Sequence, residues 1–507
     1  MQFILVVHQS APKSGAFSAN SDAILETLRE ARRRAPDAPL VLFAPRCAIE
    51  GMEGRSALES DCIRAARDAA IEKLQAEARI LKAHIFLPIE TDRGPVALVL
   101  GRRSGPAAMR AGEAPSELAS DVCPRVSVDP SDKPILLWDP FRVSEPFSAM
   151  PPAQTPPEGA ALVSPTLGGC EAGRACAGGS LVRFGSAEYA ARRYEPDALL
   201  FVCGTQGGRL SEVSAPLRVL NSPVRSASLP ADERLAAIIA AIRDYVLAVR
   251  SEGVVLGISG GVDSALVAAC AAEALGADRV RALFLASRFS SLESHTLAHR
   301  LADALGIRLA DRSIEAMHEA ACSDFADDIG QLPVGDIADQ NIQARLRSLR
   351  LMAIANKENR ILLCTANKSE AAMGYGTLYG DLSGGFAPIV DLWKSEVIAC
   401  CRAFNAWKGA EVIPEAIIQR EPTAELRPGQ KDSDSLPPYA DIERVMRAAL
   451  RSDFEPKEFA DSELSIVKAA ARFAFKRMQC ALGLRLSETT MGDFDQRFGI
   501  NRTLEWR

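Results

Sequence analysis

The loop Ser259-Gly260-Gly261-Val262-Asp263-Ser264 has the composition of a phosphate-binding turn. The apolar residues 254–256 before it predict a buried strand, and residues 264 to about 275 predict a helix. Gly257, Gly260 and Gly261 let the backbone turn tightly and approach a ligand, while the first amides of a helix favour an anion. Asp263 would repel a bare phosphate, so the loop predicts a phosphate group together with a divalent metal ion.

This loop differs from that of the common nucleotide phosphohydrolases because no Lys follows its second Gly. The simpler alternative is an ordinary Gly-rich turn between a strand and a helix. The six residues resemble the SGGxDS signature of the ATP pyrophosphatases, enzymes that split ATP into AMP and pyrophosphate to activate an oxygen atom. The flanking strand and helix patterns favour this second interpretation.

Composition and charge limit the class of protein. A chain of 507 residues with 48% hydrophobic and 24% charged residues predicts a globular protein of at least two domains. The net charge of −6 argues against a general nucleic-acid binder, and no apolar run reaches the length of a membrane span. The twelve Cys form no CxxC pair, which weakens the case for a structural zinc site and for a dithiol redox motif. We expect reduced thiols and a cytoplasmic location.

The first 205 residues alternate strand-like and helix-like runs and then continue with strands, which predicts a layered α/β domain. A stretch without periodicity, residues 206–230, predicts a linker. Residues 231–507 again alternate strands and helices, with a helix ending at Gly306 and a long helix over about 341–357. This pattern predicts a doubly wound parallel sheet, whose ligands bind at the carboxyl ends of the strands.

Several polar segments follow these predicted strands. Glu370 comes just after the strand near residues 361–365 and offers a second carboxylate to the metal ion of Asp263. Arg288 follows another strand as an always-charged donor for phosphates. Residues 422–439 are rich in Pro, Ser and Asp, which is typical of a mobile lid. Taken singly, Glu370 and Lys394 also suit a helix N-terminus and a solvated surface.

Together, and in this order, the segments SGGVDS, SRFSS, NIQARLR, TANKSE, YGDLSGGFAP and TAELRPGQ resemble NAD synthetase over essentially residues 231–507. The resemblance implies a Rossmann-like adenine nucleotide alpha hydrolase-type domain. It also implies amidation of deamido-NAD⁺ through an acyl-adenylate, with ATP as co-substrate, Mg²⁺ as cofactor, ammonia as nitrogen donor and at least a homodimer. Gln340 departs from the family, which usually carries Glu before this Asn.

The resemblance also implies roles for individual residues. The catalytic and metal-binding candidates are Asp263, Glu370 and Lys394, with the metal ion on the two carboxylates. The remaining candidates for ATP and pyrophosphate are Gly257, Ser259, Gly260, Gly261, Val262, Ser264, Arg288, Thr365 and Thr423. Those for deamido-NAD⁺ are Asn341, Arg345, Glu370, Tyr379 and Asp381.

The order of elements in the first 205 residues resembles the nitrilase-like glutaminase domain of glutamine-dependent NAD synthetases. That family uses a Glu base, a Lys and a Cys nucleophile. Here Arg46 stands in the Glu position, Trp138 in the Cys position, and the lysine motif is absent. Without a thiolate no covalent glutamyl intermediate forms. We therefore expect an inactive pseudo-glutaminase and synthesis from free ammonia, or from ammonia supplied by a separate glutaminase.

Three alternatives stay open at the level of sequence. One is glutamine-dependent synthesis through another nucleophile, for which Cys47 is the candidate because it lies near the expected base. Another is a different ATP pyrophosphatase, such as a GMP-forming enzyme; sulfur transfer is disfavoured by the missing CxxC. The third is a non-catalytic nucleotide sensor, which the joint presence of Asp263, Glu370 and Lys394 argues against.

Overall fold

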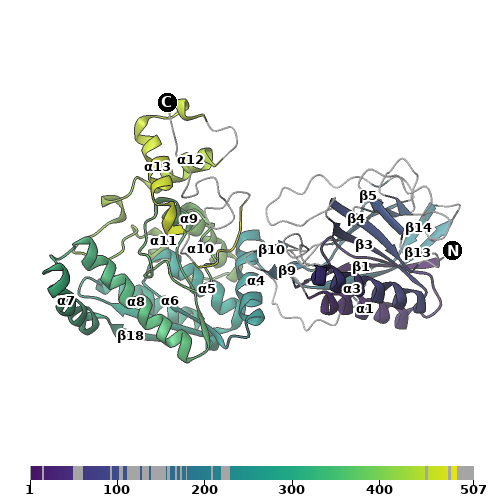
Figure 1. Cartoon of the computed structure of the whole chain (residues 1–507), viewed down its shortest axis with the longest axis horizontal. Helices are drawn as coiled ribbons and strands as arrows, with labels where there is room; N and C mark the ends of the chain where they lie inside the picture. Colours follow the sequence, from purple (N-terminus) through teal and green to yellow (C-terminus); the bar gives the residue numbers. More distant parts are fainter. Residues whose placement is uncertain are drawn as a thin grey trace. The chain divides into compact units, whose positions relative to one another are not determined.

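The computed structural model divides the chain into two compact units, shown in Figure 1. Unit 1 comprises Met1–Glu171 and Ala175–Leu229, and unit 2 comprises Ala172–Arg174 and Pro230–Arg507. The predicted boundaries at residues 205 and 231 stay predictions. The structure describes residues 2–13, 16–49, 61–91, 94–101, 107–110, 126–127, 136–138, 156, 160–165, 168–171, 174–177, 180–206, 209–218, 229–450, 455–477 and 481–487.

Unit 1 is built on a large mixed sheet with the strand order β14-β13-β1-β2-β3-β4-β5, and β15 pairs with β13. The strands β1, β2 and β3 are parallel, whereas β13 runs antiparallel to β1. The elements of this layer are β1 (Gln2–Gln9), α1 (Phe17–Arg34), β2 (Leu40–Phe43), α3 (Asp61–Ile80), β3 (Ala83–Thr91), β4 (Gly94–Leu100), β5 (Ala107–Arg110), β13 (Asp197–Gln206), β14 (Arg209–Val213) and β15 (Leu217–Arg218).

A second sheet, of order β12-β11-β8-β7-β6, covers one face of the first. Its strands are β6 (Val126–Ser127), β7 (Leu136–Trp138), β8 (Ala161–Ser164), β11 (Leu181–Phe184) and β12 (Ala187–Ala190), while β9 (Gly168–Glu171) and β10 (Arg174–Ala177) form a separate pair.

Side-chain alternation along β1 explains this layering. Ile4 and Val6 pack with the helices α1 and α3, whereas Phe3, Leu5 and Val7 pack with residues of the second sheet. Successive side chains of a strand point to opposite faces, so a continuous apolar run buries both faces of the sheet. The layered α/β sandwich predicted for this part is confirmed.

Unit 2 contains a parallel sheet of order β18-β17-β16-β19. Helix α8 packs against β16 and β19, and α5 packs against α4 and α10. The core elements are α4 (Glu233–Ala248), β16 (Gly253–Gly257), α5 (Val262–Leu275), η2 (Ala277–Arg279), β17 (Val280–Ala286), α6 (Leu292–Leu305), β18 (Leu309–Ser313), α7 (Glu315–Ile329), α8 (Ile337–Lys357) and β19 (Arg360–Leu362).

The remaining helices of unit 2 follow the sheet in sequence. They are α9 (Lys368–Met373), α10 (Lys394–Lys408), α11 (Glu415–Gln419), η3 (Asp432–Asp434), α12 (Tyr439–Ala449), η4 (Pro456–Glu458), α13 (Asp461–Arg472) and α14 (Ala474–Arg477). Helices α12 and α13 pack together (Figure 1). The predicted parallel doubly wound fold is confirmed.

The sequence also predicted local details of unit 2. Helix α6 ends at Gly306, which adopts a left-handed conformation with φ 68°, as a glycine C-terminal cap requires. Helix α8 begins at Ile337, four residues before the predicted start, because Asp336 accepts a hydrogen bond from the Ala338 amide and caps it. Within the described residues no helix is long and apolar enough to cross a bilayer, and the predicted location stays a prediction.

Candidate active site

A cavity of about 830 Å³ lies in unit 2, where β16, β17 and β19 end. Twelve of the residues singled out from the sequence line it: Gly257, Ser259, Gly261, Val262, Asp263, Ser264, Asn341, Thr365, Glu370, Asp381, Lys394 and Thr423. Parallel strands bring their carboxyl ends to one edge, which explains how segments more than 150 residues apart reach the same cavity.

The loop between β16 and α5 is held by its own side chains. The hydroxyls of Ser259 and Ser264 are 3.1 Å apart, and the Gly261 amide donates to Ser259 Oγ over 3.2 Å. Gly260 adopts φ +81°, and a Cβ there would lie 2.5 Å from the carbonyl oxygen of Ser294. The loop therefore requires glycine at this position, and it presents the N-terminus of a 14-residue helix to the cavity.

Asp263, Lys394 and Glu370 form a buried charge cluster beside this loop. Lys394 Nζ lies 2.6 Å from Asp263 Oδ2 and 3.6 Å from Glu370 Oε1, and Lys394 is 5% exposed. These residues come from α5, α9 and α10. The structure thus brings together the three residues that the sequence assigned to catalysis.

The charges in this cluster do not balance. Burial, reinforced by the negative charge of Asp263, raises the pKa of Glu370 to about 8. Burial alone would lower the pKa of Lys394, but Asp263 and Glu370 outweigh it and raise that pKa above its ordinary value. Lys394 alone therefore does not neutralise both carboxylates when Asp263 and Glu370 are ionised. Carboxylate oxygens are hard ligands of the kind that suit Mg²⁺.

Asn367, which sequence reasoning quoted but did not assign, positions both carboxylates. Its Nδ2 donates to Asp263 Oδ1 over 2.8 Å, and its Oδ1 accepts from the Glu370 amide over 3.0 Å. Glu370 Oε2 in turn accepts from the Asn367 amide over 3.2 Å. An Asn followed three residues later by Glu is a capping-box pattern, so the signal was present in the sequence.

A second polar wall of the cavity was also missed. Asp432 accepts hydrogen bonds from the hydroxyls of Tyr439, over 2.7 Å, and Tyr375, over 3.3 Å. Burial raises the pKa of both phenols, and Lys394 Nζ lies 5.2 Å from the centre of the Tyr439 ring. Arg347 adds a cation to the lining, and burial lowers its pKa to about 10, so it stays charged at neutral pH.

Thr377 links Asn341 and Asp381 by hydrogen bonds. The Thr377 hydroxyl donates to Asn341 Oδ1 over 2.7 Å, and the Thr377 amide donates to Asp381 Oδ1 over 2.8 Å. Gln340 donates to the Gly335 carbonyl and accepts from the Gln430 amide group. A glutamate carboxylate at position 340 could not donate the hydrogen bond to the Gly335 carbonyl. Gln340 therefore makes a local contact that the family's usual Glu could not make.

Other predicted residues lie elsewhere. Arg288 does not line the cavity; its guanidinium Nε donates to Glu315 Oε2 over 2.8 Å. Arg345 donates to the Leu378 carbonyl, and Tyr379 is 66% exposed. Gly260, which shapes the loop, is likewise not part of the lining. The roles predicted for these residues stay predictions.

The segment after α11 is attached to α6 by a charged contact, which we name the latch and which consists of Arg420, Glu425, Ser291 and Ser294. Glu425 Oε1 accepts from both serine hydroxyls over 2.8 Å and lies 3.0 Å from Arg420 Nη2. Arg420 Nη1 also donates to Ser294 Oγ over 2.7 Å. The latch residues Arg420, Glu425 and Ser294 line the cavity, so the predicted lid segment forms part of its wall.

In unit 1, the predicted glutaminase positions are described only in part. Arg46 and Cys47 follow the carboxyl end of β2, and both are partly buried. Cys47 adopts φ +62°, a left-handed conformation that is uncommon for a residue other than glycine. Trp138 is the last residue of β7, and its side chain lies outside the described part of the structure.

Residues 234–479 match the NAD synthase family model. The matched region contains all of the residues that line the cavity.

Relatives of the chain carry the same description. Glutamine-dependent NAD(+) synthetase of Thermotoga maritima is 39% identical over 311 residues, which is 59% of this chain and 53% of that protein. The namesake from Rhodobacter capsulatus is 41% identical over 286 residues, 54% of this chain and 51% of that protein. The chain thus spans about half the length of the curated relatives it matches.

A solved structure extends the likeness in fold to the whole chain. Glutamine-dependent NAD+ synthetase from Acinetobacter baumannii superposes with a TM-score of 0.69 over 97% of each chain, at 21% identity. At this identity the likeness concerns the fold of both units. The relatives' names contradict the expectation of a pseudo-glutaminase and do not support ammonia as the sole nitrogen donor. That expectation was based on Arg46, Trp138 and the absent lysine motif. These features do not exclude another residue as the nucleophile.

Proposed function

We propose that this protein is an NAD⁺ synthetase, a ligase that amidates deamido-NAD⁺ and splits ATP into AMP and pyrophosphate. The observation that carries the proposal is the buried cluster of Asp263, Glu370 and Lys394 beside a glycine-rich loop, within the region that matches NAD synthase. A carboxylate oxygen of the substrate would attack the α-phosphorus with departure of pyrophosphate. Ammonia would then attack the acyl carbon with departure of AMP.

The residues of the cavity would serve mainly to bind and orient. Ser259, Ser264 and the first amides of α5 face the place of the phosphates, and Lys394 adds positive charge there. Asp263 and Glu370 would hold Mg²⁺, which when bound neutralises charge on phosphate oxygens. Thr365 and Thr423 complete the proposed ATP side of the cavity.

The deamido-NAD⁺ side would involve Asn341, Arg345, Tyr379 and Asp381. Asn341 and Asp381 lie in the cavity wall, whereas Arg345 and Tyr379 do not. Tyr379 is 66% exposed, which suits contact with a second copy of the chain. This supports the proposal of a homodimer or a higher homo-oligomer, in which the partner helps to enclose the dinucleotide.

Glutamine is the nitrogen source that the relatives' names support. We propose that it is used either through Cys47 as the nucleophile of unit 1 or through a separate glutaminase that delivers ammonia. The left-handed backbone at Cys47, four residues after the end of the parallel strand β2, favours the first route, since strained turns after strands present nucleophiles in other enzymes.

Initial rates with glutamine and with ammonium chloride test the proposal. The purified protein should form NAD⁺ with ammonium chloride in a reaction that requires both ATP and deamido-NAD⁺. If Cys47 is the nucleophile, Cys47→Ala should lose the glutamine-driven rate and keep the ammonium-driven rate. The matched control Cys322→Ala, at another partly buried thiol, should keep both. A wild-type chain inactive on glutamine points to the separate glutaminase, and inactivity on both donors contradicts the proposal.

A further inference from the structure

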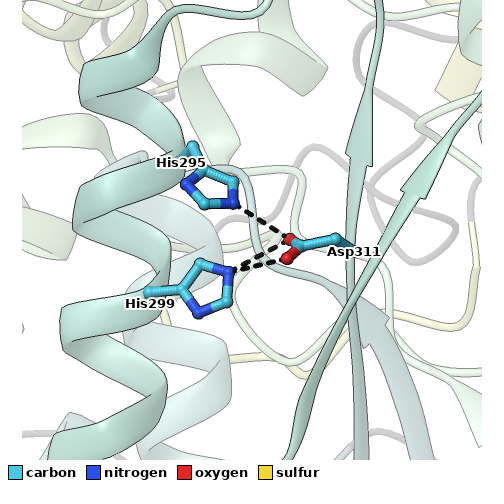
Figure 2. Close-up of side chains that lie close together, drawn as sticks. All are labelled: His295, His299 and Asp311. Carbon is cyan, nitrogen blue, oxygen red and sulfur yellow. Dashed lines mark hydrogen bonds and ion pairs between the residues drawn. The ribbon is translucent and has the colours of Figure 1, made fainter.

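A cluster of three metal-ligating side chains lies on the surface of unit 2, among residues to which the proposed reaction gives no role. His295 and His299 come from α6, and Asp311 comes from the edge strand β18. Their ligand atoms all lie within 4.8 Å of one another. Figure 2 shows both imidazole rings directed at the same carboxylate.

The backbone holds the three side chains in this arrangement. Residues four apart on a helix lie on the same face, so α6 presents both imidazoles together. Asp311 pairs in register with Phe284 of β17, and the Phe284 ring meets the His295 ring edge-on with centroids 5.2 Å apart. This contact restricts the orientation of one imidazole, and the second ring lies against it at 4.4 Å. The donors are therefore largely positioned before any ligand arrives.

The distances match those within a zinc coordination sphere. His299 Nε2 lies 3.0 Å from Asp311 Oδ1, and His295 Nε2 lies 3.3 Å from the same oxygen. Two ligands bound about 2.0–2.2 Å from a tetrahedral zinc are themselves about 3.3–3.6 Å apart. Small side-chain adjustments would thus let the two nitrogens and a carboxylate oxygen surround one ion.

The electrostatics of the cluster favour a cation. Among the described residues, the ion-pair partners of Asp311 are these two histidines alone. Each neutral imidazole can move its proton to Nδ1, which turns the Nε2 lone pair toward the carboxylate.

We propose that His295, His299 and Asp311 form a binding site for a divalent transition metal ion, with Zn²⁺ as the best fit. Two imidazoles and one carboxylate suit zinc, whereas Mg²⁺ and Ca²⁺ prefer oxygen ligands alone. The side chains of His295, His299 and Asp311 are 42%, 35% and 52% exposed, so a fourth position stays open to water or to another ligand. The ion would join α6 to β18.

The second cluster of metal-ligating residues, His318, Cys322 and Asp339, has less capacity to bind an ion. His318 Nε2 lies 2.8 Å from Asp339 Oδ1 and 3.5 Å from Cys322 Sγ, so the same nitrogen faces both partners. The side chains of His318 and Asp339 are each 8% exposed, and Gln343 and the Gly335 amide also donate to Asp339. Zinc binding at this second cluster is therefore the alternative result that the experiment has to distinguish.

Zinc titration of the full-length, tag-free chain tests the proposal, after chelation and in a thiol-free reductant. The wild type should bind Zn²⁺ at this site, and His299→Ala or Asp311→Asn should weaken that binding at least about tenfold. The matched control His84→Gln, in unit 1, should not change it. Circular dichroism of the metal-free variants should equal that of the wild type, because the side chains of His299 and Asp311 are 35% and 52% exposed.

Cobalt spectra assign the ligands independently. Co²⁺ bound here should lack the thiolate charge-transfer absorption that Cys322 would produce, and its spectrum should disappear in His299→Ala. Loss of zinc binding in His318→Gln but not in His299→Ala would place the ion in the other cluster and overturn the proposal. Absence of measurable zinc binding by the wild type would also overturn it.

Discussion

The two units place different residues where their parallel strands end. In unit 2 the segments after β16 and β19 supply Asp263 and Glu370, with Lys394 buried between them beside a cavity. In unit 1 the turn after β2 supplies Arg46 and Cys47, and Ala44, Ala48 and Ile49 of the same segment belong to an apolar core cluster. Burying like charges together is costly, and burial together with the charge of Asp263 raises the pKa of Glu370 to about 8. In unit 1 a buried group near the end of a strand is His8 in β1, and burial lowers its pKa to about 4.

Among the changes that test this difference between the two units, replacement of Asp263 should have the largest effect. Asp263→Asn removes a carboxylate from the cluster and should lower the rate of NAD⁺ formation about 10²–10³-fold. The exposed Asp278→Asn, in η2 after the same helix, is the matched control and should act like the wild type. Steady-state kinetics with ammonium chloride measure both. Wild-type rates in Asp263→Asn would remove the distinction between the two units.

Acid should destabilise unit 1 through His8. Burial lowers the pKa of His8 from 6.5 to about 4, and Nε2 finds no partner among the described residues while Nδ1 lies 2.9 Å from Thr27 Oγ1. Since the folded pKa is below the unfolded one, this stability is present above pH 6.5 and is lost as the pH falls toward 4. The loss is about 3 kcal/mol, by order of magnitude.

Hydrogen exchange of β1 measures this loss, with α5 in unit 2 as the internal reference. Protection of β1 should fall between pH 6.5 and 4 by more than the intrinsic exchange rates explain. The variant His8→Asn should flatten that dependence, whereas His84→Gln should retain it. Equal acid sensitivity of β1 in all three proteins would exclude His8 as the cause.

Asn367 sharpens the account of the cluster in unit 2. Asn367→Ala removes the donor to Asp263 and the cap of α9, and kcat should fall about 10–100-fold, as for residues that orient ligands. Asn367→Ser retains a capping oxygen but not the amide, so it should regain thermal stability without regaining kcat. Recovery of both in Asn367→Ser would reduce Asn367 to a helix cap.

The smallest effect is expected at the latch. Glu425→Gln weakens hydrogen bonds from Ser291, Ser294 and Arg420 to a carboxylate, so the latch should loosen by about 1–2 kcal/mol. Limited proteolysis between residues 420 and 430 should become faster. Glu421→Gln, in an exposed pair with Lys431, is the control and should not change the cleavage rate. Unchanged cleavage in Glu425→Gln would show that the latch does not hold this segment.

Much of the fold and of the candidate site of unit 2 was predictable, because several short sequence motifs lie in the segments that follow its strands. The glycine-rich loop specified its own strand–helix turn, and Asp263, Glu370 and Lys394 met as expected. Arg288 was expected at the phosphates, yet it pairs with Glu315, a partner 27 residues away that no local pattern reveals. The latch and the Asp432 wall depend on similarly distant pairings, which the sequence does not encode locally.

In unit 1 the strands were predictable and the chemistry was not. The apolar runs of β1 and β2 gave a sheet buried on both faces. The assignment of Arg46 and Trp138 to the replaced motif positions stays a prediction. The step from these residues to a pseudo-glutaminase is contradicted by the names of the glutamine-dependent relatives. The backbone strain at Cys47 depends on φ, which a sequence does not display.

The central claim is tested most directly by counting products. Purified protein given ATP, deamido-NAD⁺, Mg²⁺ and ammonium chloride should form NAD⁺, AMP and pyrophosphate in equal amounts. Omission of deamido-NAD⁺ should stop AMP formation. Formation of ADP in place of AMP, or AMP formation that does not depend on deamido-NAD⁺, would contradict the account.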